Sequence, residues 1–236
     1  MPRTGTSLAK NFLGDYPGLD VLGFQRGGFF HAWRASKNTD DIILDKATHY
    51  IRNLKKIDRA YGNRVAYCCL IRDPRDELVS LLETSKHREI KRDDRFWSQW
   101  VRTYSRYLHF AEKVGDDSRC YLLRYEDLVR WPVAVKEDFL TWLGLDANLE
   151  ALTSTYRILN QDDIQDWKVE ERRTITPQSI GRWSRESDPE RVELFQEWQN
   201  NADAEKLMKM MGYGQDYIEH LALDSPSLSV FQRRGM

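Results

Sequence analysis

Short apolar runs alternate along this chain with longer amphipathic segments, and this alternation restricts the fold more than any other feature. Four runs have the length of strands: 20–24, 41–47, 64–72 and 119–125. The two middle runs are apolar on both faces, which is typical of strands in a parallel sheet that helices cover on each side. Because strands that alternate with helices pair in parallel through right-handed crossovers, the sequence predicts a three-layer α/β sandwich around a central parallel sheet.

Helical periodicity fills the segments between these runs. The sequence predicts helices over 6–14, 49–62, 74–86, 93–115, 131–145 and 189–212. Five residues of the long helix share one stripe, which either packs in the core or lines a sugar site: Phe96, Trp100, Tyr104, Leu108 and Ala111. A length of 236 residues suits one α/β domain, so we expect a single domain over residues 1–236 with a loose tail from about residue 220.

Charge and cysteine content narrow the classes of function. The 36 Lys and Arg residues nearly cancel the 37 Asp and Glu residues, and the net charge of −1 argues against a nucleic-acid partner. Cys68, Cys69 and Cys120 form neither a disulfide framework nor a metal motif, so we expect reduced, buried thiols, no metal and a cytoplasmic location. Because the sequence has neither a signal peptide nor an apolar stretch of roughly 20 residues, we expect no membrane partner.

The opening stretch leads directly into the first predicted helix. It combines a guanidinium, a glycine and three hydroxyl side chains: Arg3, Thr4, Gly5, Thr6 and Ser7. A glycine turn exposes backbone N–H groups and a helix N-terminus adds positive potential, so the stretch suits an anion. The alternative is a simple Ser/Thr cap of the helix. No Lys follows Gly5, so the stretch is not the G-x-x-x-x-G-K-[ST] loop that binds nucleoside triphosphates.

The segment CLIRDPRDELVSLL places Arg72 at the carboxyl end of a predicted strand and Ser80 about two turns into the next helix. Ligands of parallel α/β sheets bind at the carboxyl ends of the strands. Arg72 and Ser80 therefore either hold a phosphate together, or they are an ordinary salt bridge and a surface serine.

The segment ILDKATHY ends a buried strand with two charges. Charges in such a place are costly unless they are used or paired. Asp45 is a candidate general base, Lys46 a candidate cation for developing negative charge, and His49 a rival base. The alternatives are an ion pair for Asp45 and Lys46 and a structural role for His49.

Two further motifs follow: YEDL at 125–128, ahead of a helix that contains FLTWLGL, and Gly181-Arg182-Trp183 in a polar loop. We assign the YEDL motif no chemistry. Trp183 either stacks on a base while Arg182 reaches a phosphate, or both belong to an ordinary loop with one packed Trp.

In this order and spacing the motifs resemble those of sulfotransferases that use 3′-phosphoadenosine 5′-phosphosulfate (PAPS). Members of that family carry P-[KR]-[ST]-G-[ST]-[ST] at the start of a helix, R-[DN]-P-x-[DE]-x-x-x-S after a central strand, Y-E-D-L before F-L-x-x-L-G-L, and a G-R-W or G-D-W loop. The DKATHY stretch is similar to the E-K-[ST]-x-x-Y element of the carbohydrate-type members. The resemblance extends from residue 1 to about residue 185 and implies a fold like that of the P-loop nucleotide-binding proteins.

The resemblance also implies roles for individual residues. The opening loop would hold the 5′-phosphosulfate through Arg3, Thr4, Gly5, Thr6 and Ser7, and Arg72 and Ser80 would bind the 3′-phosphate. The loop of Gly181, Arg182 and Trp183 would close over the nucleotide. Asp45 and Lys46 match the catalytic pair. The implied reaction is in-line transfer of the sulfuryl group to an acceptor oxygen or nitrogen, with 3′-phosphoadenosine 5′-phosphate (PAP) as product and no metal.

Three departures from the family pattern affect these expectations. Family members have a buried strand before the opening loop, and here only Met1 precedes the motif, so we expect the first strand to be lacking or shortened. Arg3 stands where many members have Lys, which keeps the charge on a bulkier group. Asp45 replaces the usual Glu and is one methylene shorter, so the base must sit closer to the acceptor or act through water, or His49 takes its role.

The sequence identifies neither the acceptor nor the oligomeric state. A basic stretch after the 3′-phosphate helix either forms a rim for an anionic glycan or pairs with neighbouring acids: Lys86, His87, Arg88, Lys91, Arg92 and Arg95. We therefore expect a small-molecule or glycan acceptor. The two alternative functions are a nucleotide kinase, for which Asp45 is the only candidate Mg²⁺ carboxylate, and a non-catalytic module that binds PAP or a glycan.

Overall fold

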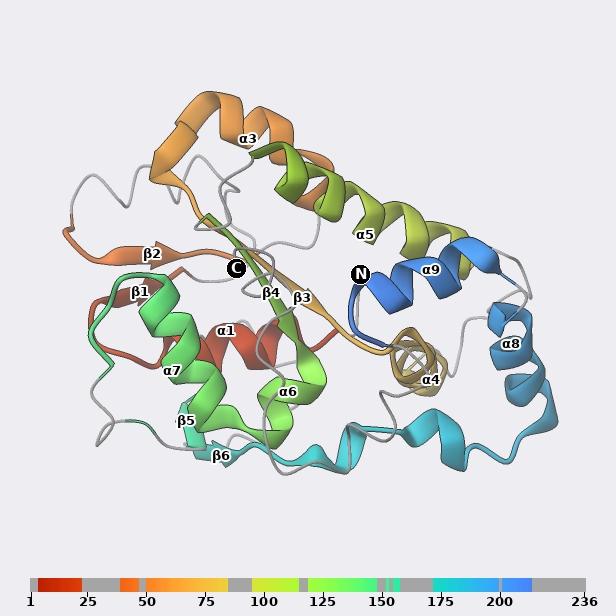
Figure 1. Cartoon of the computed structure of the whole chain (residues 1–236). Helices are drawn as coiled ribbons and strands as arrows, with labels where there is room; N and C mark the ends of the chain where they lie inside the picture. The colour runs from red at the N-terminus through yellow and green to blue at the C-terminus, as the bar shows by residue number, and fades with distance from the viewer. Residues whose placement is uncertain are drawn as a thin grey trace.

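Parallel strands with helices on both sides form the centre of the molecule (Figure 1). The computed structural model describes residues 4–22, 39–46, 50–84, 95–114, 119–147, 152, 155–157, 172–199 and 201–213. In it, β1 (Leu19–Val21) pairs in parallel with β2 (Ile42–Leu44), and β3 (Tyr67–Ile71) pairs in parallel with β4 (Cys120–Arg124). Each of the four predicted strand regions overlaps one of these strands, so the predicted parallel α/β architecture is confirmed.

Helices precede, connect and follow these strands. They are α1 (Thr6–Gly14), α3 (Leu54–Tyr61), α4 (Pro74–Thr84), α5 (Arg95–Val114), α6 (Tyr125–Arg130), α7 (Pro132–Trp142), α8 (Pro189–Gln199) and α9 (Ala202–Met210). The sequence explains why α4 begins at Pro74. Proline is preorganised for a first helical position, and the acids Asp76 and Glu77 in the first turn interact favourably with the helix dipole. In the described ranges, no helix is both long and apolar enough to cross a membrane.

Two apolar cores pack on opposite faces of β4, because successive side chains of a strand point to opposite faces. Cys120 and Leu122 pack into a core with α5, whereas Tyr121 and Leu123 pack into a second core with α1 and α7. The aromatic stripe of α5 belongs to the first core, with four of its five residues buried and Phe96 packed against them. Its interpretation as core is therefore confirmed. The three cysteines are free thiols, and Cys68 is exposed although burial was expected.

Three details differ from the expectation. The strand predicted over 119–125 ends at Arg124, and Tyr125 begins α6, because Glu126 and Asp127 favour the first turn of a helix. The helix predicted over 189–212 is two helices, since the Asn201 side chain caps α9 by accepting a hydrogen bond from the Ala204 N–H at 3.0 Å. The segment 49–62 contains the 3₁₀ turn Tyr50–Arg52 before α3.

A small antiparallel pair was not predicted. It joins β5 (Thr155–Arg157) to β6 (Arg172–Thr174), which leads through the 3₁₀ turn Pro177–Ser179 to the turn Arg182–Arg185. β5 and β6 have no apolar run like those that predicted the equally short β1 and β2.

Candidate functional site

The opening loop enters α1 through a left-handed glycine. Gly5 has φ +89°, and a Cβ at this position would lie 2.4 Å from the Tyr125 ring. The Ala9 N–H donates to the Gly5 carbonyl at 3.0 Å, so the amides that precede Ala9 in the first turn have no acceptor within the helix. These amides, together with the hydroxyls of Thr6 and Ser7, form an N-terminus that suits a phosphate or sulfate group.

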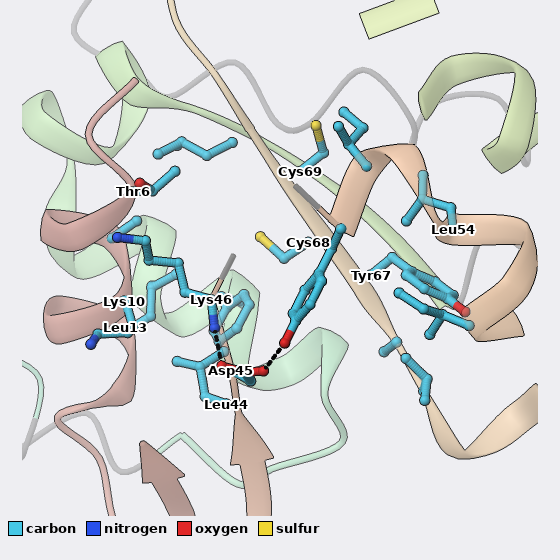
Figure 2. Close-up of a pocket in the computed structure, with 18 of the residues that line it drawn as sticks. Thr6, Lys10, Leu13, Leu44, Asp45, Lys46, Leu54, Tyr67, Cys68 and Cys69 are labelled. Carbon is cyan, nitrogen blue, oxygen red and sulfur yellow. Dashed lines mark hydrogen bonds between the residues drawn. The ribbon is translucent and has the colours of Figure 1, made fainter. Parts of the chain in front are cut away.

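Asp45 and Lys46 lie directly beside this loop, at the carboxyl end of β2 (Figure 2). Lys46 Nζ donates to Ser7 Oγ at 3.0 Å, across 39 positions of the sequence. Asp45 accepts from the Tyr50 hydroxyl at 2.5 Å and from the Lys46 N–H at 2.8 Å. Burial, and then the hydrogen bond to Asp45, raises the pKa of Tyr50 well above its usual range, so Tyr50 stays a neutral donor that orients the carboxylate.

Arg72 directly follows the last residue of β3 and is 4 % exposed. Its guanidinium lies 4.5 Å from the centre of the Tyr125 ring and donates to the Ser179 carbonyl at 3.0 Å. The Tyr125 hydroxyl is 2.8 Å from Ser179 Oγ. One tyrosine therefore contacts both the opening loop, through Gly5, and the candidate 3′-phosphate arginine. Ser80 lies on the adjoining helix α4, six residues after Pro74.

The loop of Gly181, Arg182 and Trp183 is held against α4. The Asp76 carboxylate accepts from the Gly181 N–H at 2.7 Å and from the Trp183 N–H at 3.1 Å. The Arg75 guanidinium lies 3.8 Å from the centre of the Trp183 ring. Arg182 pairs with Glu83, on the same helix. The loop that would cover a nucleotide is thus fixed by the helix that follows Arg72.

Two carboxyl groups are fully buried behind the site. Glu126 accepts from the Asp73 N–H at 2.9 Å and from the Tyr213 hydroxyl at 2.7 Å, and burial raises its pKa to about 7. Burial raises the pKa of Glu77 to about 8, although Arg72 acts in the opposite direction. Both side chains are therefore protonated at mildly acidic pH in the folded chain, and both ionise around neutral pH.

This burial makes stability depend on pH. The folded chain binds more protons than the unfolded chain between about pH 4.5 and pH 8, so the free energy of unfolding falls as the pH rises through this window. We expect Glu77→Gln to reduce that fall by on the order of 1–2 kcal/mol, because the amide cannot ionise. Urea unfolding at pH 5 and pH 8 measures the effect, with the exposed Glu112→Gln as control. Equal pH slopes for the variant and the unmodified chain would contradict the assignment.

The contact between Gly5 and Tyr125 gives a second prediction. Gly5→Ala forces a Cβ into the Tyr125 ring at a left-handed position, so we expect PAP affinity to fall about tenfold besides a backbone cost of roughly 1–2 kcal/mol. Gly62→Ala is the matched control, since Gly62 also has positive φ but a Cβ there would meet no atom within 4 Å. Calorimetric titration and thermal unfolding separate the two effects. Equal PAP affinity in both variants would show that the ring contact is unimportant.

A cavity of about 670 Å³ opens between β2 and β3 and reaches the opening loop (Figure 2). Its polar lining includes Thr4, Thr6, Lys10, Asp45 and Lys46. Most of the other lining residues are apolar side chains of β2, β3, α3, α5 and α7. Asp45 and Lys46 thus lie where a ligand in the cavity meets the opening loop.

The structure brings together residues from all the motifs that the sequence singled out. Thr4, Gly5, Thr6 and Ser7 join Asp45 and Lys46, and Arg72 joins the Gly181–Trp183 loop. Arg3, His49 and residues 85–94 of the basic stretch lie outside the described residues. Sequence reasoning missed Tyr50, Asp76 and Tyr125, although each stands within a quoted motif. In the described part of the chain, no group of three or more His, Cys, Asp or Glu side chains is placed to hold a metal ion.

Comparison with known proteins gives a family match. A family model described as "Sulfotransferase family" matches residues 24–148, just over half of the 236 residues. No sequence among the curated proteins matches the chain. This family match argues against the kinase alternative.

Solved structures share the fold. The sulfotransferase domain of the Synechococcus PCC 7002 olefin synthase has a TM-score of 0.58 at 19% identity, with 85% of this chain and 92% of that chain covered. The sulfotransferase domain of the curacin biosynthetic pathway has a TM-score of 0.52 at 14% identity, covering 90% and 95%. Mouse sulfotransferase SULT7A1 complexed with PAP has a TM-score of 0.51 at 14% identity, covering 88% and 84%. The family-model match and the shared fold together show that this chain belongs to the sulfotransferase family.

Proposed function

We propose that the protein transfers the sulfuryl group of PAPS to a hydroxyl or amine of a small-molecule or glycan acceptor. The observation that carries the proposal is the 3.0 Å hydrogen bond between Lys46 Nζ and Ser7 Oγ. It supports the proposal, because Lys46, the chain neighbour of the candidate base Asp45, contacts a helix N-terminus that suits an anion. A proton acceptor, a cation and an anion-binding loop are the three parts that in-line transfer of an anionic group needs.

The residues present fit the nucleotide. Thr4, Gly5, Thr6 and Ser7 would hold the phosphosulfate, since Gly5 allows the turn and the amides of the first helical turn point to the ligand. Arg72 and Ser80 would hold the 3′-phosphate. Trp183 and Arg182 would cover the nucleotide, and α4 holds their loop through Asp76.

When bound, PAPS supplies an activated sulfuryl group with a phosphate as its leaving group. Asp45 takes the proton of the acceptor hydroxyl on one of its carboxylate oxygens, each of which has room for a further hydrogen bond. Tyr50 fixes the orientation of that carboxylate. Lys46 stabilises negative charge on the leaving oxygen, and its contact with Ser7 keeps it close to the opening loop.

Calorimetric titration with PAP, ADP and ATP, without magnesium, tests the proposal. We expect micromolar binding of PAP and much weaker binding of ADP, because only PAP carries the 3′-phosphate that Arg72 would bind. Sulfation of a panel of alcohols and glycans with labelled PAPS would then identify the acceptor. Equal affinity for PAP and ADP would contradict the 3′-phosphate site, and PAP binding without turnover on any acceptor would favour the non-catalytic module.

The loop contact of Asp76 gives a further prediction. Asp76→Asn replaces one of its two acceptor oxygens by a donor, which leaves a loop N–H without its partner, and this costs about 1–2 kcal/mol. We expect PAP affinity to fall about five- to tenfold and trypsin to cleave faster at Arg182. Asp203→Asn, an exposed position on α9, is the control. Unchanged cleavage and affinity would show that Asp76 does not hold the loop.

A further inference from the structure

The turn that ends α9 directs one tyrosine into the interior of the molecule. Gly212 follows α9 in the left-handed region, with φ +82°, a conformation that glycine adopts without steric cost. The Gly212 N–H donates to the Lys209 carbonyl at 3.2 Å. The Tyr213 N–H donates to the Met208 carbonyl at 2.8 Å, which completes the pair of hydrogen bonds of a Schellman helix end. This turn fixes the backbone of Tyr213, and the tyrosine side chain is buried.

Tyr213 contacts a carboxylate at the start of α6. Its hydroxyl donates to Glu126 Oε2 at 2.7 Å, across 87 positions of the sequence. The other carboxylate oxygen, Oε1, accepts from the Asp73 N–H at 2.9 Å. Because Glu126 is buried, bulk water cannot take the place of either donor. The two hydrogen bonds therefore join Tyr213 to the short segment of backbone between β3 and α4.

The Asp73 N–H matters for Arg72 because these two residues share a peptide bond. A peptide unit is planar, so the hydrogen bond from the Asp73 N–H to Glu126 also restrains the Arg72 carbonyl and the torsion angle ψ of Arg72. The Arg72 guanidinium lies 4.5 Å from the centre of the ring of Tyr125, which is the chain neighbour of Glu126. The backbone and the guanidinium of Arg72 are thus both held by residues 125–126.

A second contact joins the turn after α9 to the same region. Arg124, the last residue of β4, pairs with Asp127 at 2.7 Å, and its guanidinium reaches the Gly212 carbonyl at 3.5 Å. The turn therefore contacts the junction of β4 and α6 at two places, Arg124 and Glu126. Two contacts restrict rotation of the turn more than one contact would, which keeps the hydroxyl of Tyr213 directed at Glu126.

We propose that Tyr213 is a positioning residue for the 3′-phosphate site: through Glu126 it fixes the backbone of Asp73 and so holds Arg72 in the geometry that binds the phosphate. This inference rests on the proposed function, because it concerns the role proposed for Arg72. Tyr213 acts through Glu126 and not by contact with the nucleotide. A residue outside all the motifs of the sequence thus helps to determine how well the site distinguishes a nucleotide with a 3′-phosphate from one without.

Tyr213→Phe in the full chain tests the proposal, because it removes only the hydroxyl. We expect the ratio of PAP affinity to ADP affinity, measured by calorimetric titration, to fall about fivefold, which is the usual effect of a lost buried hydrogen bond. A general loss of structure would weaken both ligands, whereas a misplaced Arg72 weakens PAP. Tyr121→Phe is the matched control, since the Tyr121 hydroxyl also donates to a carboxylate, that of Asp138 on α7, at 2.6 Å. This control should leave the ratio unchanged.

A double-mutant cycle shows whether the effect depends on Arg72. In the Arg72→Ala background, Tyr213→Phe should leave the ratio of PAP affinity to ADP affinity unchanged, because the side chain that the tyrosine positions has already been removed. An equal fall of the ratio with and without Arg72 would overturn the proposal. An equal loss of PAP affinity and ADP affinity in Tyr213→Phe would also overturn it.

Hydrogen exchange of the Asp73 amide, followed by NMR, gives a readout that needs no nucleotide. We expect Tyr213→Phe to accelerate this exchange about fivefold, because Glu126 loses a donor that orients it, and Tyr121→Phe to leave the rate unchanged. An unchanged rate in Tyr213→Phe would overturn the proposal whatever the result with PAP. If the unmodified chain shows no preference for PAP over ADP, the proposed function fails, and the exchange rate still shows whether Tyr213 holds the backbone beside Arg72.

Discussion

Asp45→Asn is expected to slow sulfuryl transfer by about 10²–10⁴-fold, which is the usual contribution of a positioned general base. The amide keeps the shape of the side chain and still accepts a hydrogen bond from Tyr50, but it cannot take the acceptor proton. PAP affinity should stay unchanged, because Asp45 would act on the acceptor. Single-turnover kinetics with labelled PAPS and calorimetric titration with PAP measure the two quantities.

The control for this experiment is Asp20→Asn, an exposed position on the neighbouring strand β1. It should leave both the rate and the affinity as they are. Full activity of Asp45→Asn would mean that His49 or a water molecule is the general base. A loss of PAP affinity equal to the loss of rate would mean that Asp45 maintains the opening loop instead of removing a proton.

Arg72→Ala is expected to weaken PAP binding by about 2–3 kcal/mol, or roughly 30- to 150-fold, because a phosphate charge loses its buried partner. ADP, which has no 3′-phosphate, should lose far less affinity. The ratio of PAP affinity to ADP affinity is therefore the informative quantity. Arg72 also contacts Ser179 and Tyr125, so damage to the site as a whole would weaken both ligands equally.

Two further variants make this result specific. Arg72→Lys keeps the charge but not the planar fork, so we expect it to restore only part of the affinity for PAP. Arg59→Ala removes an exposed arginine from α3 and should change nothing. Unchanged PAP affinity in Arg72→Ala would rule out the 3′-phosphate assignment.

Much of the fold was predictable because it depends on local pattern. The four parallel strands follow from apolar runs, and α1, α4, α5 and α7 follow from periodicity and from their start signals. Two of the places where the predicted elements were wrong are decided by polar contacts. Asn201 caps α9 and so divides the helix predicted over 189–212, although the apolar periodicity continues through it. Glu126 lies at the start of α6, where a strand was predicted to continue, and it accepts hydrogen bonds from the Asp73 N–H and the Tyr213 hydroxyl.

The sequence by itself determined which residue types stand at the ends of the strands: the glycine loop, the Asp45–Lys46 pair and Arg72. Spacing along the chain was enough for this, because strand ends and helix starts are local features. Only the tertiary structure decided which of these residues meet. Lys46 reaches Ser7 across 39 positions and Asp76 holds Gly181 across 105 positions, and these contacts depend on how the helices pack on the strands. Among the residues that the structure describes, it also decided that β2 pairs with β1 and β3 with β4, because strand pairing depends on a neighbour that local sequence does not specify.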